Sequence, residues 1–95
     1  FLIQHVSTID YPHYFTPNGD GFNDYWNING LKGQYAKIYI FDRYGKLIKQ
    51  LSPDTQGWDG TYNGNPLPAS DYWFSVEYFE LNITKQFKAH FSLKR

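Results

Sequence analysis

Regularly spaced turn signals are the feature that most constrains the fold of this chain. Clusters of Gly, Pro, Asn and Asp mark turns, because these residues adopt positive φ or pre-set the bend of the backbone. They recur along the whole sequence, at 16–21, 29–30, 44–45, 52–54, 59–60, 63–66, 68 and 81–82. The intervening runs are short and rich in β-branched and aromatic residues, a pattern typical of a sandwich or barrel.

The final two runs carry the clearest strand signal. Between 86 and 94, apolar and polar residues alternate, which is the period of a strand with one buried face. The preceding run, 72–79, is apolar on both sides, and so is the earlier run 37–41. The run 37–41 is predicted to be a central strand covered on both faces, and 72–79 to take a central position in a sandwich. The Leu81-Asn82 turn between the last two runs predicts a β-hairpin.

The remaining runs complete an all-β prediction. Strands are expected at 46–51, as the return strand of a second hairpin, and at 25–28, while residues 1–10 are either a first strand or the end of a preceding region. No segment repeats apolar residues at helical spacing over three turns. Aromatic residues make up 21% of the chain and can supply a core. The sequence therefore predicts one domain over 1–95, a single antiparallel immunoglobulin-like β-sandwich of about seven strands.

Charge and composition exclude several functional classes. Nine Lys and Arg balance nine Asp and Glu, which disfavours a nucleic-acid binder and a polybasic membrane-surface module. The absence of Cys excludes disulfide scaffolds, thiolate zinc sites and cysteine catalysis. No apolar run approaches the length of a transmembrane helix. Because the chain also lacks Met, we expect it to belong to a longer protein whose targeting peptide lies outside it.

The histidines give no indication of catalysis. His5, His13 and His90 are the only three, and none has a Ser or Asp at a spacing that suggests a triad. No Gly-rich loop leads into a helix, so the sequence offers no phosphate cradle. We therefore expect the three side chains to lie on the surface of a protein that is not an enzyme.

The loop 18–24 is the strongest candidate for a ligand. Oxygen ligands for Ca²⁺ are available from the side chains of Asn18, Asp20 and Asp24 and from the carbonyl of Phe22. With Gly21 at the glycine position of a calcium loop, the first and twelfth positions are Thr16 and Asn27, neither of them a carboxylate. This partial match favours a turn held by its own Asx hydrogen bonds, with Ca²⁺ binding as the alternative.

Two further groups of aromatic residues have structural and functional interpretations. In Trp58-Asp59-Gly60-Thr61, the indole is predicted to anchor in the core while Asp59 and Gly60 form the turn. Aromatic side chains along 72–79 could stack on sugar rings, as in carbohydrate-binding modules. A central position in a sandwich accounts better for a strand that is apolar on both sides, so a core role is favoured.

Taken together, these blocks resemble a known family. The blocks are 15–24, then Trp26, Ile28 and 30–31, then 38–45, then 58–61, 63–64, 67–68 and 71–73, and a last strand ending in Lys94-Arg95. In this order they resemble the gliding motility-associated C-terminal domain of Bacteroidota, the type B sorting domain of the type IX secretion system. The similarity covers about residues 11–95.

The resemblance implies a role in protein export. Domains of this family follow large exported cargo domains, including those of adhesins, and cross the periplasm on their way to the cell surface or the medium. The implied partners are outer-membrane components of the type IX machinery and a cognate partner protein. No nucleic acid and no cofactor is implied.

A basic bias in the last strand suggests which surface a receptor reads. The hypothesis is that recognition uses the exposed residues Lys88, His90, Lys94 and Arg95 together with Arg43. For the terminal basic pair alone, spacing favours simple charges that end a strand. The rival functions are a structural spacer of a surface adhesin and a carbohydrate-binding module.

Overall fold

Seven strands and no helix make up the described part of the chain. A computed structural model describes residues 10–19, 21, 23–29, 36–80 and 82–95. The strands are β1 (Tyr14–Phe15), β2 (Ala36–Phe41), β3 (Leu47–Leu51), β4 (Thr61–Tyr62), β5 (Asn65–Pro66), β6 (Ser70–Glu80) and β7 (Ile83–Leu93). The predicted all-β class and number of strands are confirmed. The possible first strand at 1–6 lies outside the described residues.

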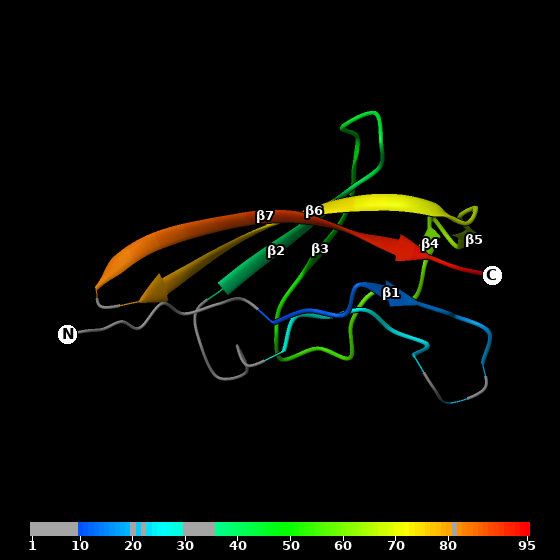
Figure 1. Ribbon diagram of the computed structural model, residues 1–95, viewed down its shortest axis with the longest axis horizontal. Helices are drawn as coiled ribbons and strands as arrows, with labels where there is room; N and C mark the ends of the chain where they lie inside the picture. The colour runs from blue at the N-terminus through cyan, green and yellow to red at the C-terminus, as the bar shows by residue number, and fades with distance from the viewer. Residues whose placement is uncertain (1–9, 20, 22, 30–35, 81) are drawn as a thin grey trace.

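Five of the strands form one sheet in the order β1-β7-β6-β2-β3 (Figure 1). Every neighbouring pair in it is antiparallel except β1 and β7, which run parallel with Tyr14 beside Ser92 and Phe15 beside Leu93. The expectation of an antiparallel sheet therefore fails at this one pair. Parallel neighbours need a long connection rather than a hairpin, and here most of the chain lies between the two strands. Strands β4 and β5 pair separately.

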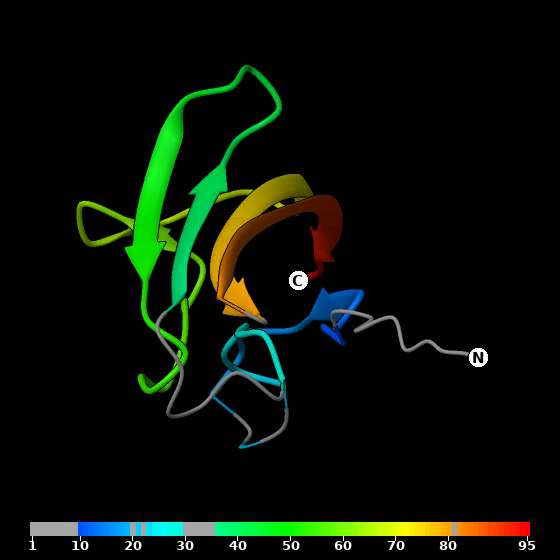
Figure 2. The same ribbon diagram turned by 90° about the vertical axis from the view of Figure 1, so that its left-hand side faces the viewer.

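The predicted hairpin of the last two strands is confirmed and is the longest feature of the fold. Strands β6 and β7 pair over eleven positions, from Ser70 opposite Leu93 to Glu80 opposite Ile83. Asn82, in the loop between them, has a φ of 63°, the left-handed conformation that short hairpin loops demand. Figure 2 shows the two strands curving together into an arch that opens toward the segment around β1.

The concave face of this arch holds the core. Its members are Phe15, Trp26, Ile28, Ile38, Ile40, Leu51, Trp58, Tyr72, Phe74, Val76, Tyr78, Phe91 and Leu93. Strand β6 contributes alternate residues from Tyr72 to Tyr78, as a strand with one buried face should. The opposing layer is mostly irregular chain that carries the two buried tryptophans, so the architecture is sandwich-like with one regular sheet.

The strand expected at 25–28 is reduced to a single bridge. Trp26 pairs with Trp58 through two backbone hydrogen bonds of 2.9 Å, and no ladder continues from it. Asn27 is the reason, because its side chain binds nearby backbone. Its Oδ1 accepts a hydrogen bond from the Ile28 N–H, while its Nδ2 donates to the carbonyls of Ser52 and Thr55. An Asn side chain that binds backbone in this way competes with strand pairing.

Two predicted turns are confirmed in detail. Asn63 and Gly64, between β4 and β5, have φ values of 53° and 83°, the pair of positive angles of a type I′ hairpin turn. In the Trp58 loop, the indole is buried and its Nε1 donates to the Thr61 carbonyl. The Asp59 carboxylate accepts hydrogen bonds from the backbone N–H and the hydroxyl of Thr61, which closes the turn.

Gly57 is the residue that lets the two tryptophan segments meet. Its φ is 119°, and a Cβ there would lie 2.6 Å from the Trp26 carbonyl oxygen. That oxygen accepts the backbone hydrogen bond from Trp58. Any side chain at position 57 would therefore push apart the bridge that closes the core.

We predict that Gly57→Ala destabilises the domain more than Gly64→Ala. Gly64 also has a left-handed φ, but nothing lies within 4 Å of a Cβ placed on it. The control should cost about 1 kcal/mol from its backbone angle alone. Crowding should raise the cost at position 57 to about 3 kcal/mol. Urea denaturation of both variants measures the difference, and equal midpoints would contradict the prediction.

Candidate functional site

Large aromatic side chains lie on the convex, outer face of the sheet. Trp73 of β6 is 41% exposed and Phe79 of the same strand is 55% exposed, while Tyr39 and Phe41 of β2 are half-buried. The prediction that β2 is covered on both faces was therefore wrong, and the core role favoured for the aromatic residues of β6 holds only for alternate positions. A run of apolar residues at successive positions shows that both sides of a strand are apolar. It does not show whether a second layer exists to cover each side.

A hollow opens in this outer face, and the sheet register explains it. Ser75 of β6 lies between Tyr39 of β2 and Lys88 of β7 in the paired strands, with Trp73 two residues away on its own strand. A small side chain surrounded by long ones leaves a depression whose floor is Ser75, only 7% exposed. The volume is about 620 Å³. We call this feature the outer hollow; its lining includes Tyr39, Phe41, Arg43, Trp73, Ser75, Gln86 and Lys88.

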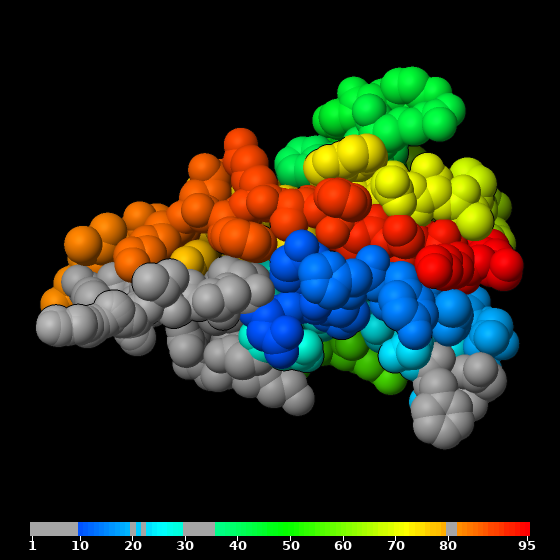
Figure 3. Space-filling view, viewed as in Figure 1, coloured from blue at the N-terminus to red at the C-terminus, as the bar shows by residue number. Residues whose placement is uncertain are grey.

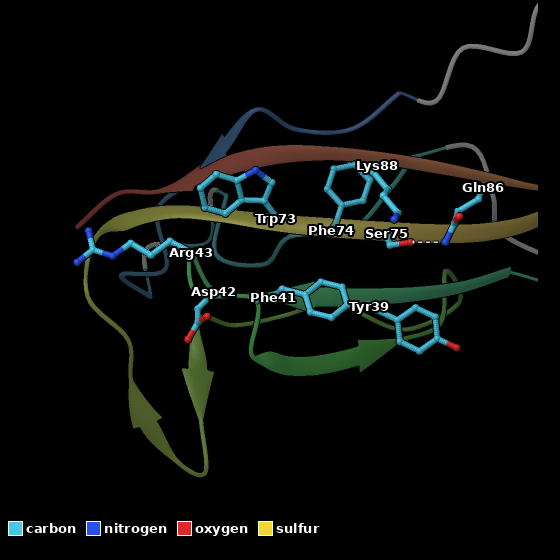
Figure 4. Close-up of a pocket in the computed structure, with 10 residues that line it drawn as sticks. Tyr39, Phe41, Asp42, Arg43, Trp73, Phe74, Ser75, Gln86 and Lys88 are labelled. Atoms are coloured by element: carbon cyan, nitrogen blue, oxygen red, sulfur yellow. Dashed lines mark hydrogen bonds between the residues drawn. The ribbon is translucent and has the colours of Figure 1, made fainter.

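Polar groups in the outer hollow lie among its rings (Figure 4). The Gln86 Nε2 donates a 3.0 Å hydrogen bond to the Ser75 hydroxyl oxygen, which fixes both side chains at the floor. Phe41 and Trp73 are partners across β2 and β6. The arrangement combines an apolar wall, a polar floor and a lysine at the rim, which suits binding rather than covalent chemistry.

Three of the five predicted recognition residues lie on or beside the outer hollow. Lys88 and Arg43 both line it. His90 stands directly opposite Trp73, with the two ring centroids 5.9 Å apart. Arg43 belongs to the β2–β3 loop, which projects beyond the body of the sheet in Figure 3 (green). Its guanidinium donates to the Tyr44 hydroxyl at 2.8 Å.

The loop that carries Arg43 is shaped by Asp42. One oxygen of the Asp42 carboxylate accepts hydrogen bonds from the backbone N–H groups of Tyr44 and Lys46. Gly45 supplies the positive φ that the turn requires. Asp42 also lines the outer hollow, and one oxygen of its carboxylate holds this turn.

The other two predicted residues, Lys94 and Arg95, lie apart from the outer hollow and make contacts within the fold. The Lys94 ammonium lies 4.8 Å from the centre of the Tyr14 ring. Arg95 donates from Nε to the Leu67 carbonyl at 2.7 Å and from a terminal nitrogen to the Gly60 carbonyl at 3.3 Å. Arg95 thereby ties the end of β7 to the loops around β4 and β5.

Tyr72 packs at the same end of the sheet. Burial raises the pKa of its hydroxyl above the usual value, an effect that the positive charge of Arg95 partly opposes. The hydroxyl donates a 2.9 Å hydrogen bond to the Pro68 carbonyl, which requires that the proton stay in place. Tyr72 is therefore a structural hydrogen-bond donor at neutral pH.

The candidate calcium loop is closed by Asp24. Its Oδ1 accepts hydrogen bonds from the backbone N–H groups of Asn18 and Gly19, and its Oδ2 accepts one from Gly21. The other two proposed ligands, Asp20 and Phe22, lie outside the described residues. Within the described ranges, no group of three or more His, Cys, Asp and Glu side chains could hold a metal ion. Calcium binding stays a prediction.

Sequence reasoning missed the outer hollow itself. Tyr39, Trp73 and Gln86 were not singled out as site residues. The runs that carry Tyr39 and Trp73 were predicted to be central strands, and Gln86 was placed on the polar side of a strand with one buried face. The available signal was Ser75, a small polar residue between larger ones on a strand that is rich in aromatic residues. That signal becomes readable only once the register places Tyr39 and Lys88 on either side of it.

Comparison with known proteins places the chain in a family. The model of the CHU_C type IX secretion signal domain family matches residues 9–93. No curated protein and no solved structure matched the chain. No helix in the described ranges is long and apolar enough to cross a membrane.

We predict that the Asp24 carboxylate stabilises its loop without a cation. Asp24→Asn replaces one accepting oxygen with an NH₂ group, which should lower stability by about 1–2 kcal/mol in chelator-treated protein. Millimolar Ca²⁺ should leave the melting temperature of the unmodified protein unchanged. If Ca²⁺ raises the melting temperature of the unmodified protein but not that of Asp24→Asn, the loop is instead a cation site.

We predict that Arg95 contributes more to stability than Lys94. Arg95→Ala removes two charge-assisted hydrogen bonds between distant loops and should cost about 1–2 kcal/mol. Lys94→Ala removes one exposed cation–π contact and should cost about 0.5–1 kcal/mol. Urea denaturation compares the two variants. Equal losses of stability in the two variants would mean that only the positive charge of each residue matters.

Proposed function

Because the chain belongs to the CHU_C type IX secretion signal domain family, we propose that it directs attached cargo domains through the type IX system and across the outer membrane. The family match over residues 9–93 is the observation that carries this proposal. It agrees with the resemblance seen in the sequence, and it assigns the chain to a family of secretion signals, which is not a catalytic family. Export by this system follows from membership.

The route is the finer part of the proposal. Cargo and domain enter the periplasm together, the domain folds there, and outer-membrane components of the machinery with a cognate partner recognise the folded surface. The cargo then reaches the cell surface or the medium. The long β6–β7 hairpin and its closed core support recognition of a folded domain, since they present fixed side chains on the outer face.

Recognition is proposed to use the exposed outer side of β7 with the neighbouring loop. Lys88 of β7 and Arg43 of the β2–β3 loop line the outer hollow, and His90 lies beside it, opposite Trp73. Lys94 and Arg95 contribute indirectly, since their contacts hold Tyr14 and the loops at Gly60 and Leu67 in place. Removing the pair would therefore affect export through the fold as well as through charge.

A carbohydrate-binding module is the second candidate function. The exposed ring of Trp73, with Tyr39 and Phe41 nearby, is the observation that favours it. Such a row of aromatic side chains on a sheet face offers stacking surfaces. It explains neither the family match nor the basic residues beside the rings.

A fusion assay tests the sorting function. Residues 1–95 are joined to the C-terminal end of a fluorescent reporter that carries a Sec signal peptide, in a type IX-competent bacterium and in its translocon-deficient mutant. Reporter is measured in medium, on the surface and in the periplasm. We expect most of it to leave the periplasm only in the competent strain. Retention in the periplasm of both strains would overturn the proposal.

A further inference from the structure

The outer hollow has the composition of a binding hot spot. Interface centres are enriched in Trp, Tyr and Arg that surround small, desolvated depressions. Here Trp73 and Tyr39 stand around Ser75, and Arg43 lies at one end. The hollow is formed by residues of three neighbouring strands, so its shape is set by a hydrogen-bonded sheet. A partner would meet a preformed surface, which lowers the entropic cost of binding.

The charges around the outer hollow favour an anionic partner. Lys88 stands opposite Ser75 at the rim, and Arg43 lines the hollow near the β2–β3 loop. Asp42 also lines the hollow, and one oxygen of its carboxylate accepts hydrogen bonds from two backbone N–H groups of its turn. Glu77 lies two residues beyond Ser75, directly across from Lys37 in the register of β2 and β6. The lining therefore carries two basic side chains against one carboxylate, an excess of positive charge that an anionic ligand would balance.

We propose that the outer hollow is the docking site for an acidic segment of a protein partner. An aliphatic or aromatic side chain of that segment packs against Trp73 above Ser75, and its carboxylates lie beside Lys88 and Arg43. The inference rests on the proposed function, whose export machinery supplies the partner. A protein segment fits better than a neutral glycan, because a glycan would use the rings and leave the excess positive charge of the lining unbalanced.

Export of the reporter fusion tests the docking site with two matched pairs of variants. Lys88→Glu is compared with Lys49→Glu, an exposed lysine on β3, and Trp73→Ala with Phe79→Ala, a more exposed ring on the same side of β6. Each hollow variant should reduce translocon-dependent export by about tenfold or more, as loss of a hot spot does. Both controls and Lys88→Arg should export normally.

Thermal melting of each purified variant separates docking from folding. Lys88 is exposed, so Lys88→Glu should melt close to the unmodified domain and keeps the test valid even where Trp73→Ala unfolds. Normal export of the unmodified fusion together with normal export of Lys88→Glu would overturn the docking site and leave the sorting function intact. If the unmodified fusion itself is not exported, the sorting function is overturned, and the docking site that rests on it falls as well.

Fluorescence tests the glycan as the rival occupant. Trp26 and Trp58 are buried, so added ligand should act mainly on Trp73. Cellohexaose and chitohexaose are the neutral probes. We expect neither to change the emission at millimolar concentration. If either sugar quenches the emission, and still does so in Lys88→Glu, the rings bind sugar without the cation. That result would overturn the proposal.

Discussion

The pairing of Trp26 with Trp58 holds the irregular part of the chain against the sheet. Two backbone hydrogen bonds of 2.9 Å join them, and the Trp26 ring stacks on Phe91 of β7 with centroids 4.1 Å apart. Buried indoles need partners for their N–H groups. Pro12 and Thr61 supply carbonyls for this purpose, so the bridge also fixes the segments on either side. A domain of this size depends on such contacts, because few strands cover its core.

This bridge determines which face of the sheet is left for recognition. Irregular segments that carry Trp26 and Trp58 cover the concave side of the sheet. The aromatic residues on the convex side stay partly exposed. An arch built by two long strands has a single concave side for a small chain to fill. The outer hollow is therefore a consequence of how the core closes, and its position follows from the register that places Ser75 between larger neighbours.

Local signals predicted the parts of the fold that local chemistry determines. The β6–β7 hairpin, the Asn63-Gly64 turn and the buried Trp58 with its Asp59 turn could all be read from neighbouring residues. The parallel pairing of β1 with β7 could not, since it joins residues about eighty positions apart. The 25–28 strand failed because the side chain of Asn27 binds backbone that its spacing does not reveal.

The candidate site, too, could be predicted only in part from the sequence. The sequence indicated basic residues near the end of the chain, but not that they have different tasks. Arg95 binds carbonyls at Gly60 and Leu67, contacts that span 35 and 28 positions and that no local pattern encodes. Lys88 and Arg43, by contrast, line the outer hollow beside exposed rings.

This division bears on how terminal truncations are interpreted. Deleting Lys94 and Arg95 removes the hydrogen bonds that hold two loops as well as two positive charges, so lost export after such a deletion would not separate folding from recognition. Lys88 separates them, because it is exposed and its side chain lies on the face opposite the core. Recognition in a domain this small is best measured at residues that the core does not need.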